Sequence, residues 1–338
     1  MNPSLTLEAS PTALRPALRL IKTKDLDRQD WLEVRKNGIG SSDAAAAVGL
    51  NPYQSQLELW LIKTGRDQGL SKPDPNDETS AMYWGTLLEP IVAAHYTKRT
   101  GNRVRRVNAV LQHPAPDHHW MLANIDREVM GAADVQILEC KTAGKHGSRL
   151  WNDGVPEYIQ LQVQHQLAVT GKQAADVAVL ICGQELQVHR IHRDDRLIQK
   201  LIELESRFWH YVTTDTPPPC DGSNSAAQAL QCLYPRDNGE RLDFREDRQM
   251  SALFTDFLDA KAQAERFEAL QTQYKQQIQE RMGLASVADF ETGSVSWKRS
   301  KDTQYLDTAK LLADYPDLRE AYTTSRKGSR RFVITASP

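Results

Sequence analysis

The sequence predicts a mixed α/β domain over about residues 25–215, followed by a separate C-terminal extension. The expected elements run helix, three strands, helix, two strands and helix, which is typical of a mixed sheet covered by helices. The apolar run Ala174–Cys182 indicates a strand that is buried on both faces. With 40% hydrophobic and 25% charged residues, the 338-residue chain has the composition of an ordinary globular protein.

The first elements combine a helix start with hydroxyl groups and a cation. Residues 28–48 predict a helix, a glycine-bearing turn and a second helix capped by Ser41, Ser42 or Asp43. Free backbone N–H groups, two hydroxyls and the guanidinium of Arg35 would suit a phosphate group. The alternative is a simple helix cap with Arg35 on a solvated face.

A helix from Tyr83 to Thr100 is expected to follow a polar loop at residues 68–80. Glu89 interrupts the apolar stripe of this helix. A buried carboxylate needs a cation, a hydrogen-bond donor or a metal. Glu89 is therefore a candidate site residue, with an ordinary salt bridge as the alternative.

The segment Met121–Lys141 contains Asp126, Glu139 and Lys141. Glu139 and Lys141 would share one face of a strand, and a turn around residues 131–133 would fold Asp126 back beside them. Carboxylates are preferred ligands of Mg²⁺, which activates phosphodiesters, and a lysine can orient the attacking water. The alternative is a solvated hairpin with a surface E-x-K pair.

The other elements of this domain complete the sheet and its cover. Two strands, Arg103–Gln112 and His119–Ile125, are expected before the hairpin, and a strand at Glu185–Ile191 after the apolar run. Helices are expected at Val155–Thr170 and Asp194–Val212. The first of these two carries four alternate glutamines, Gln160, Gln162, Gln164 and Gln166, and their spacing leaves open which of them face inward.

Three regions are expected along the chain: a flexible tail at 1–24, the α/β domain at 25–216 and an extension at 217–338. The run Pro217–Pro219 marks the second boundary. The extension predicts a long amphipathic helix, Met250–Ile278, suited to an antiparallel or coiled-coil arm. A hairpin at 290–299 and a closing strand at 332–334 follow. The basic run at 325–332 suits either a nucleic-acid backbone or a solvated loop.

The net charge and the cysteines limit which ligands and which cellular compartment we expect. The net charge of −2 does not favour nucleic-acid binding by the whole surface, so a polyanion would need a local basic site. The four cysteines have no C-x-x-C spacing, which argues against structural zinc. Because we find no leader and no apolar run long enough for a membrane span, we expect a cytosolic protein without membrane contact.

Five motifs occur in a fixed order between Asp30 and Tyr211. They are W-L-x-x-R with G-I-G-S-S-D-A (Trp31, Arg35, Gly38–Ala44), W-G-T-L-L-E-P (Trp84–Pro90), M-L-A-N-I-D (Met121–Asp126), L-E-C-K-T (Leu138–Thr142) and P-E-Y-x-x-x-Q-V-Q (Pro156–Gln164). Together they resemble the YqaJ-type viral recombinases, the phage lambda exonuclease-like branch of the PD-(D/E)xK nucleases. The resemblance implies the restriction-endonuclease-like core of that class, a mixed central sheet flanked by helices.

The resemblance also implies an activity and partners. We expect a Mg²⁺-dependent exonuclease, with Mn²⁺ as a substitute, that degrades linear double-stranded DNA from 5′ to 3′. It would release mononucleotides and leave 3′ overhangs for a single-strand annealing recombinase. Relatives suggest a homotrimeric ring that acts on DNA ends in the cytoplasm of a bacterium carrying a phage or prophage.

By matching position, the resemblance assigns roles to residues. Asp126, Glu139 and the backbone carbonyl of Cys140 would hold the metal, and Glu89 would contribute through a water or a second metal. Lys141 would act on the attacking water, and Gln162 would hold the lysine or the water, with Gln164 as a further possibility. Arg35, Ser41, Ser42 and Asn124 would bind the 5′ phosphate. Arg127 stands where the family has a small residue and would add a phosphate contact.

Two other functions remain open on the sequence. One is an endonuclease on the same fold that cuts internal or branched DNA. The other is a DNA-tethering module without catalysis, with the C-terminal arm as its working surface. The intact Asp126, Glu139 and Lys141 argue against the second.

Overall fold

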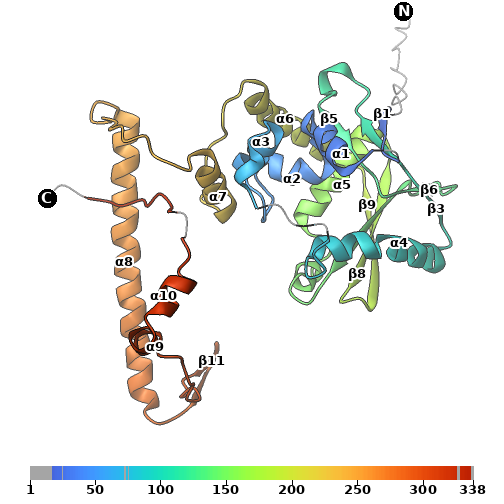
Figure 1. Ribbon diagram of the computed structural model, residues 1–338. Helices are drawn as coiled ribbons and strands as arrows, with labels where there is room; N and C mark the ends of the chain where they lie inside the picture. The colour runs from blue at the N-terminus through green and yellow to red at the C-terminus, as the bar shows by residue number, and fades with distance from the viewer. Residues whose placement is uncertain (1–16, 25, 72–73, 75, 326–327, 336–338) are drawn as a thin grey trace, which may run out of the picture. The chain divides into compact units, whose positions relative to one another are not determined.

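A five-stranded mixed sheet is the centre of the larger part of the computed structural model (Figure 1). Its strands lie in the order β3 (Arg103–Arg106), β6 (Arg127–Met130), β7 (Ile137–Ala143), β8 (Ala174–Ile181) and β9 (Glu185–His192). Strands β7 and β8 are parallel, and the other neighbours are antiparallel. The parallel pair requires a crossover, which helix α5 provides. The predicted mixed α/β fold with helices flanking the sheet is confirmed.

Helices α4 (Ala81–Thr100) and α5 (Glu157–Thr170) cover opposite faces of this sheet. Leu138 of β7 packs in a cluster with α4, whereas its neighbour Ile137 packs with α5. Because side chains alternate along a strand, Glu139 faces the α5 side together with Ile137. The register of β7 therefore directs the predicted acidic residue toward the helix that carries the glutamines.

A second, four-stranded sheet has the order β1 (Leu18–Lys22), β4 (Ala109–Gln112), β5 (Met121–Ala123) and β2 (Ile39–Gly40). The single strand expected at Arg103–Gln112 is wrong. The run breaks at residues 107–108, and its halves, β3 and β4, enter different sheets. Part of the segment expected as a tail, residues 18–22, forms β1, which pairs antiparallel with β4; residues 1–16 lie outside the described residues.

The remaining helices of this part surround α5 and the small sheet. They include α1 (Arg28–Lys36), the 3₁₀ turn η1 (Ser41–Asp43), α2 (Ala44–Ala47), α3 (Gln56–Lys63), α6 (Asp195–Thr213) and α7 (Asn224–Leu233). Helices α2, α3 and α6 share buried apolar clusters in which Trp60 and Phe208 are almost completely buried. This second core also contains Ile39 of β2, which connects these helices to the small sheet.

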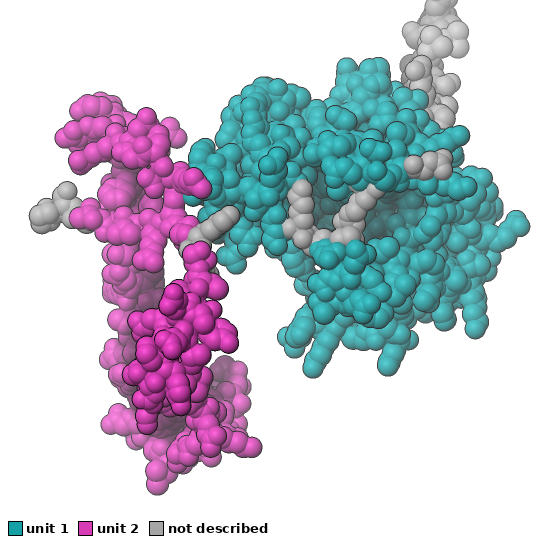
Figure 2. Space-filling view, in the orientation of Figure 1, with its two compact units in different colours: residues 1–235 teal, residues 236–338 magenta. Residues whose placement is uncertain are grey.

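The structure describes residues 17–24, 26–71, 74, 76–325 and 328–335, which fall into two compact units (Figure 2). Unit 1 runs to Pro235 and unit 2 comprises residues 236–338. The domain boundary that we expected after residue 216 lies directly before the proline run at 217–219. The compact unit extends further because α7 returns to α3, where Ser225 Oγ donates to Glu58 Oε2 at 2.5 Å.

Unit 2 is built on the 35-residue helix α8 (Arg248–Met282), followed by the hairpin β10 (Val287–Phe290) and β11 (Gly293–Ser296). Two short helices, α9 (Thr308–Asp314) and α10 (Asp317–Tyr322), come next. The predicted long helix and hairpin are confirmed, but the closing strand is wrong, because residues 332–334 form no strand. Within the basic run at 325–332, residues 326–327 lie outside the described residues. No helix in the described part of the chain is both long and apolar enough to cross a membrane.

Candidate active site

The β6–β7 hairpin brings Asp126 beside Glu139. Asp126 directly precedes β6, and its Oδ2 accepts a hydrogen bond of 2.8 Å from the main-chain N–H of Cys140 in β7. Gly131 begins the turn between the two strands with φ of 77°, a conformation that favours glycine. The predicted hairpin therefore forms, and it fixes one carboxylate against the strand that carries the other.

Glu139, Lys141 and Gln162 form a closed hydrogen-bonded network. Lys141 Nζ lies 2.8 Å from Glu139 Oε1 and donates to Gln162 Oε1 at 3.0 Å. Gln162 Nε2 donates to Glu139 Oε1 at 2.6 Å. The carboxylate side chain is only 4% exposed and the lysine 26%, so the ammonium group is the more accessible of the two. The structure thus brings together four residues expected at the site: Asp126, Glu139, Lys141 and Gln162.

Gln166 also contacts Glu139, and the sequence did not single it out. Its Nε2 donates to Glu139 Oε2 at 2.8 Å and to the main-chain oxygen of Asn124 at 3.2 Å. Gln162 and Gln166 are four residues apart, so they lie on one face of α5. The helical period alone could have identified this pair, because it places Gln162 and Gln166 on one face of α5 and Gln164 on another.

Gln164 is not a site residue. Its Nε2 donates to the main-chain oxygen of His192, and its Oε1 accepts from the main-chain N–H of Asp194. Both partners lie at the junction of β9 and α6. The expectation that Gln164 contributes to the site is therefore wrong, because its amide joins two other elements of the fold.

The site is short of positive charge. Burial, and then the neighbouring Glu139, raise the pKa of Asp126 from 3.8 to about 8. Burial alone would lower the pKa of Lys141, but the attraction of Glu139 outweighs it, and the pKa of the lysine is raised. One ammonium group thus faces two carboxylates. A divalent cation would relieve this imbalance.

A cavity of about 330 Å³ opens onto these groups between α4 and β7. Its walls are formed by Ala81, Met82, Gly85, Thr86, Glu89, Asp126 and residues 139–142. Among the described residues, no three Asp, Glu, His or Cys side chains gather around a single point. A metal here would have the carboxylates of Asp126 and Glu139, a main-chain oxygen and water as its ligands, which suits Mg²⁺ because Mg²⁺ usually keeps several waters.

Glu89 reaches the wall of this cavity from α4, where it is ion-paired. Arg127 and Arg106 both donate to its Oε1, the latter at 3.2 Å. Arg127 is 7% exposed and also donates to the main-chain oxygen of Asp126 at 2.7 Å. In this structure Arg127 therefore orients Glu89 and the Asp126 backbone, and it does not form part of the cavity wall, where a phosphate contact would be made.

A second polar cluster surrounds Arg35. Its guanidinium donates to Ser42 Oγ and to Asp43 Oδ1, each at 2.7 Å, and lies 4.7 Å from the ring centre of Trp31. Lys63 Nζ donates to the other carboxylate oxygen of Asp43 at 2.6 Å. Burial would raise the pKa of Asp43, but Arg35 and Lys63 outweigh it and hold the pKa well below its ordinary value. Burial outweighs the attraction of Asp43 and lowers the pKa of Lys63. With Arg35 and Lys63 both charged, two cations share one carboxylate and the cluster has a net positive charge.

Asp43 and Lys63 are functional candidates that sequence reasoning missed. Asp43 was considered only as a helix cap. Lys63 lies 20 residues further along the chain, at the end of α3, and its side chain is 2% exposed. A lysine at the end of a helix gives no signal that it turns inward, since its partner comes from another helix.

The Arg35 cluster and the carboxylate site are connected through Asn124. Ser41 Oγ donates to the main-chain oxygen of Asn124 at 3.4 Å, and the same oxygen accepts from Gln166. Strand β2 pairs in parallel with β5, and Gly38 permits this approach, because a Cβ there would lie 2.4 Å from the oxygen of Trp120. The two halves of the predicted site therefore lie on adjacent segments of one unit.

The side chains of Ser41 and Asn124 have partners within the fold. Ser41 is 4% exposed, and Asn124 Nδ2 donates to the main-chain oxygen of Ala109 in β4 at 3.3 Å. Ser42 is exposed and Arg35 is half-buried, so both are more accessible to a ligand than Ser41.

Comparison with known proteins places this arrangement in a family. The YqaJ-like viral recombinase domain matches residues 30–173, which contain all the clusters described above. YqaJ, an uncharacterized protein of Bacillus subtilis (strain 168), is 34% identical over 306 residues that cover 89% of this chain and 92% of that protein. Protein D345L of African swine fever virus (strain Badajoz 1971 Vero-adapted) is 24% identical over 253 residues, which cover 65% of this chain and 72% of D345L.

Among solved structures, the chain is similar to an alkaline exonuclease (LHK-Exo) from Laribacter hongkongensis, at 24% identity and a TM-score of 0.46. That match covers 55% of this chain and 93% of the exonuclease. The identity and coverage shared with the Bacillus protein, together with the domain match, establish the relationship at the level of sequence. The chain belongs to the YqaJ-like viral recombinase domain family.

Proposed function

We propose that this protein is a metal-dependent exonuclease that degrades linear double-stranded DNA from the 5′ end. The observation that carries the proposal is the network in which Lys141 and Gln162 both contact Glu139, beside Asp126. A nuclease site needs carboxylates for a metal and a cation beside the attacking water. The membership of a viral recombinase family supports the same reading.

Each residue of the site has its own role in hydrolysis. Asp126, Glu139 and the main-chain oxygen of Cys140 would hold Mg²⁺, with Mn²⁺ as a substitute, and Glu89 would act through a water or a second ion. When bound, the metal polarises the scissile phosphate and neutralises developing charge. Lys141 orients the attacking water, and Gln162 fixes the position of the lysine. Because Gln162 and Gln166 hold both oxygens of Glu139, the carboxylate is oriented before substrate binds.

The Arg35 cluster supports end recognition. A 5′ phosphate carries more negative charge than an internal phosphodiester, so a pocket with net positive charge favours termini. Arg35 and Ser42 would contact this phosphate, with Ser41 and Asn124 shaping the pocket beneath it. The products would be mononucleotides and a 3′ overhang for a single-strand annealing recombinase, and a homotrimeric ring would keep the enzyme on its DNA.

A time course on linear duplexes labelled at either end, with Mg²⁺ or EDTA, tests the proposal. We expect loss of the 5′ label first, only with the metal. Lys141→Ala should slow degradation by about a hundredfold or more, because it removes the cation nearest the water. Lys200→Ala, an exposed lysine of α6, is the matched control and should leave the rate unchanged.

Two outcomes would contradict the proposal. If Lys141→Ala degraded the duplex as fast as the parent, the assigned site would be wrong. If internal or branched sites were cut without any dependence on ends, the protein would be an endonuclease on the same fold.

A further inference from the structure

Helix α8 of unit 2 carries a long apolar seam that is open to solvent. Every side chain from residue 248 to 277 is exposed except the half-buried Leu258. Phe267 is 65% exposed, and Phe257 remains 38% exposed although its ring contacts that of Phe332 edge to face. A continuous exposed apolar stripe of this kind is typical of an interaction surface.

The spacing of the seam is that of a coiled coil. Steps of three and four residues alternate through Met250, Leu253, Phe257, Ala260, Ala264, Phe267, Gln271, Tyr274 and Ile278. Only Gln271 is polar. A strict seven-residue repeat over four heptads indicates left-handed pairing with another long helix.

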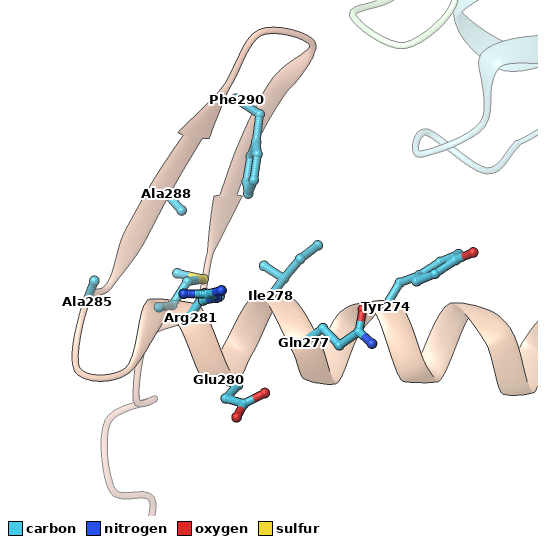
Figure 3. Close-up of a pocket in the computed structure, with 9 residues that line it drawn as sticks. Tyr274, Gln277, Ile278, Glu280, Arg281, Ala285, Ala288 and Phe290 are labelled. Atoms are coloured by element: carbon cyan, nitrogen blue, oxygen red, sulfur yellow. The ribbon is translucent and has the colours of Figure 1, made fainter.

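The C-terminal end of the seam continues into a cavity of about 870 Å³ (Figure 3). Ile278 projects from the side of α8 on which the β10–β11 hairpin lies, Tyr274 lies further along this side with its ring directed away from the hairpin, and Phe290 projects from the hairpin back toward the helix (Figure 3). Ala285 and Ala288 add small apolar groups to the same wall. The hairpin therefore widens the apolar surface at this end of α8, which would accept large side chains from a partner helix.

We propose that α8 pairs with α8 of a second copy of this chain in an antiparallel coiled coil, with Lys261 opposite Glu268 of the second copy. Charge complementarity supports a second copy as the partner and, among the antiparallel alignments, favours this one. The two-fold axis of such a dimer makes the Lys261–Glu268 pair twice. In antiparallel coiled coils these flanking positions lie beside the apolar seam, where opposite charges favour pairing.

The same alignment matches the sizes of the apolar residues. Phe267 faces Ala264 of the second copy, so an aromatic ring meets a small residue. Leu253 and Phe257 of the second copy face Ile278 and Tyr274, and thus fall at the cavity beside the hairpin. Large side chains are accommodated where the surface is open, and the distance between the helices stays even along the seam.

Other arrangements of two α8 helices are less favourable. A shift by one heptad in either direction would place Lys261 opposite Lys261, or Glu268 opposite Glu268. A parallel pair would stack the small residues Ala260 and Ala264 on themselves between two broad phenylalanine layers. Like charges or uneven spacing therefore disfavour each alternative.

Charge reversal in the full-length protein tests the pairing. A chain ending at Pro235 lacks α8, and the species that it forms is the reference. In sedimentation velocity over a concentration series, we expect the full-length protein to associate into a species with twice as many chains as this reference. Lys261→Glu or Glu268→Lys should each weaken this step by about tenfold or more, and the two substitutions together should restore it. Glu265→Lys is the control, because it reverses a charge away from the seam and removes only the contact of 3.4 Å with Lys261 within the helix.

Cysteine cross-linking gives a second, independent readout of the alignment. In a background with the exposed Cys182 and Cys220 replaced by serine, a mixture of Lys261→Cys and Glu268→Cys proteins should form a disulfide-linked dimer under oxidation, and neither variant alone should do so. The proposal is overturned if the parent never doubles its mass or if the double reversal fails to restore association. It is also overturned if Glu268→Lys has no effect while Lys261→Glu weakens the dimer, which would indicate a parallel pair. Nuclease assays on the same variants keep this result separate from the proposed activity.

Discussion

End recognition is expected to depend on Arg35. Asp43 and Ser42 fix its guanidinium, and Lys63 supplies the second positive charge of the cluster. We predict that Arg35→Ala lowers the rate on 5′-phosphorylated duplexes, by roughly tenfold, to the rate on unphosphorylated ones. The measurement compares both duplexes for parent and variant.

The neighbouring Lys36 provides the matched control for this prediction. It has the same charge and lies on the same helix, but it pairs with Glu33 at 2.7 Å. Lys36→Ala should therefore keep the preference for phosphorylated ends. A preference that survived in Arg35→Ala would show that the terminal phosphate is bound elsewhere.

Asp126 is expected to make the metal-free protein less stable as the pH rises. Its pKa is raised from 3.8 to about 8, so between these values the folded chain retains a proton that the unfolded chain has lost. The free energy of unfolding therefore falls as the pH rises from about 4 to 8. Asp126→Asn should raise it at pH 8 by about 1 to 3 kcal/mol, and much less at pH 4.

Urea denaturation in EDTA at both pH values measures this effect. Asp153→Asn, which changes an exposed carboxylate near Trp151, serves as the control and should give no such pH dependence. Equal effects of Asp126→Asn at the two pH values would contradict the prediction. In the parent, Mg²⁺ binding should release a proton at neutral pH and strengthen as the pH approaches 8.

At the scale of elements, the sequence was sufficient to predict contacts between residues that lie close together in the chain. The turn before β7 and the two-residue period of Glu139 and Lys141 together predict the carboxylate–lysine cluster. The strand break at residues 107–108 was not predictable in this way, because both halves of Arg103–Gln112 are compatible with extended structure and only pairing sends them to different sheets. Lys63 and Gln166 were missed for a related reason, since their partners are brought to them by tertiary packing.

Helices α5 and α6 are joined by a buried ion pair directly behind the site. His165 Nδ1 lies 2.7 Å from Glu205 Oε1, and His165 Nε2 lies 2.9 Å from the main-chain oxygen of Leu122. When Glu205 is ionised, both ring nitrogens face acceptors, which favours a proton on each. Burial would lower the pKa of His165, but Glu205 outweighs it, and the pKa is raised above 6.5.

We predict that Glu205→Leu destabilises the protein by about 3 kcal/mol or more, because it leaves His165 buried without its carboxylate. A raised histidine pKa stabilises the fold fully below pH 6.5, and this contribution is lost as the pH rises through the folded pKa. The difference between parent and variant should therefore be largest near pH 6 and shrink at alkaline pH, as measured by urea denaturation. Glu203→Leu, on an exposed position of the same helix, should change stability by about 0.5 kcal/mol at most.

At the scale of the whole molecule, every residue assigned to catalysis or end binding lies in unit 1. The net charge of −2 is compatible with DNA binding because the positive charge is local, at the Arg35 cluster. Unit 2 contributes the α8 seam. The chain thus separates the proposed chemistry from the proposed pairing of copies.

This separation predicts how truncated chains behave. A chain ending at Pro235 should fold and degrade DNA at the rate of the full-length protein, but lose the mass doubling attributed to α8. A chain ending at Thr216 lacks α7, whose Ala226 and Ala229 are buried and whose Ser225 bonds to Ser55 and Glu58 of the α3 region. Its midpoint of thermal unfolding should be lower than that of the 235-residue chain by about 5 °C or more.

The two truncations also test whether the domain ends at the proline run, as the composition suggests, or only after α7. The proline run at 217–219 is where composition changes, yet the core of unit 1 is closed only by the helix beyond it. If the chain ending at Thr216 were as stable as the one ending at Pro235, α7 would be dispensable and the earlier boundary would hold. If the chain ending at Pro235 folded but lost nuclease activity, unit 2 would have a part in catalysis that the position of the site residues does not provide.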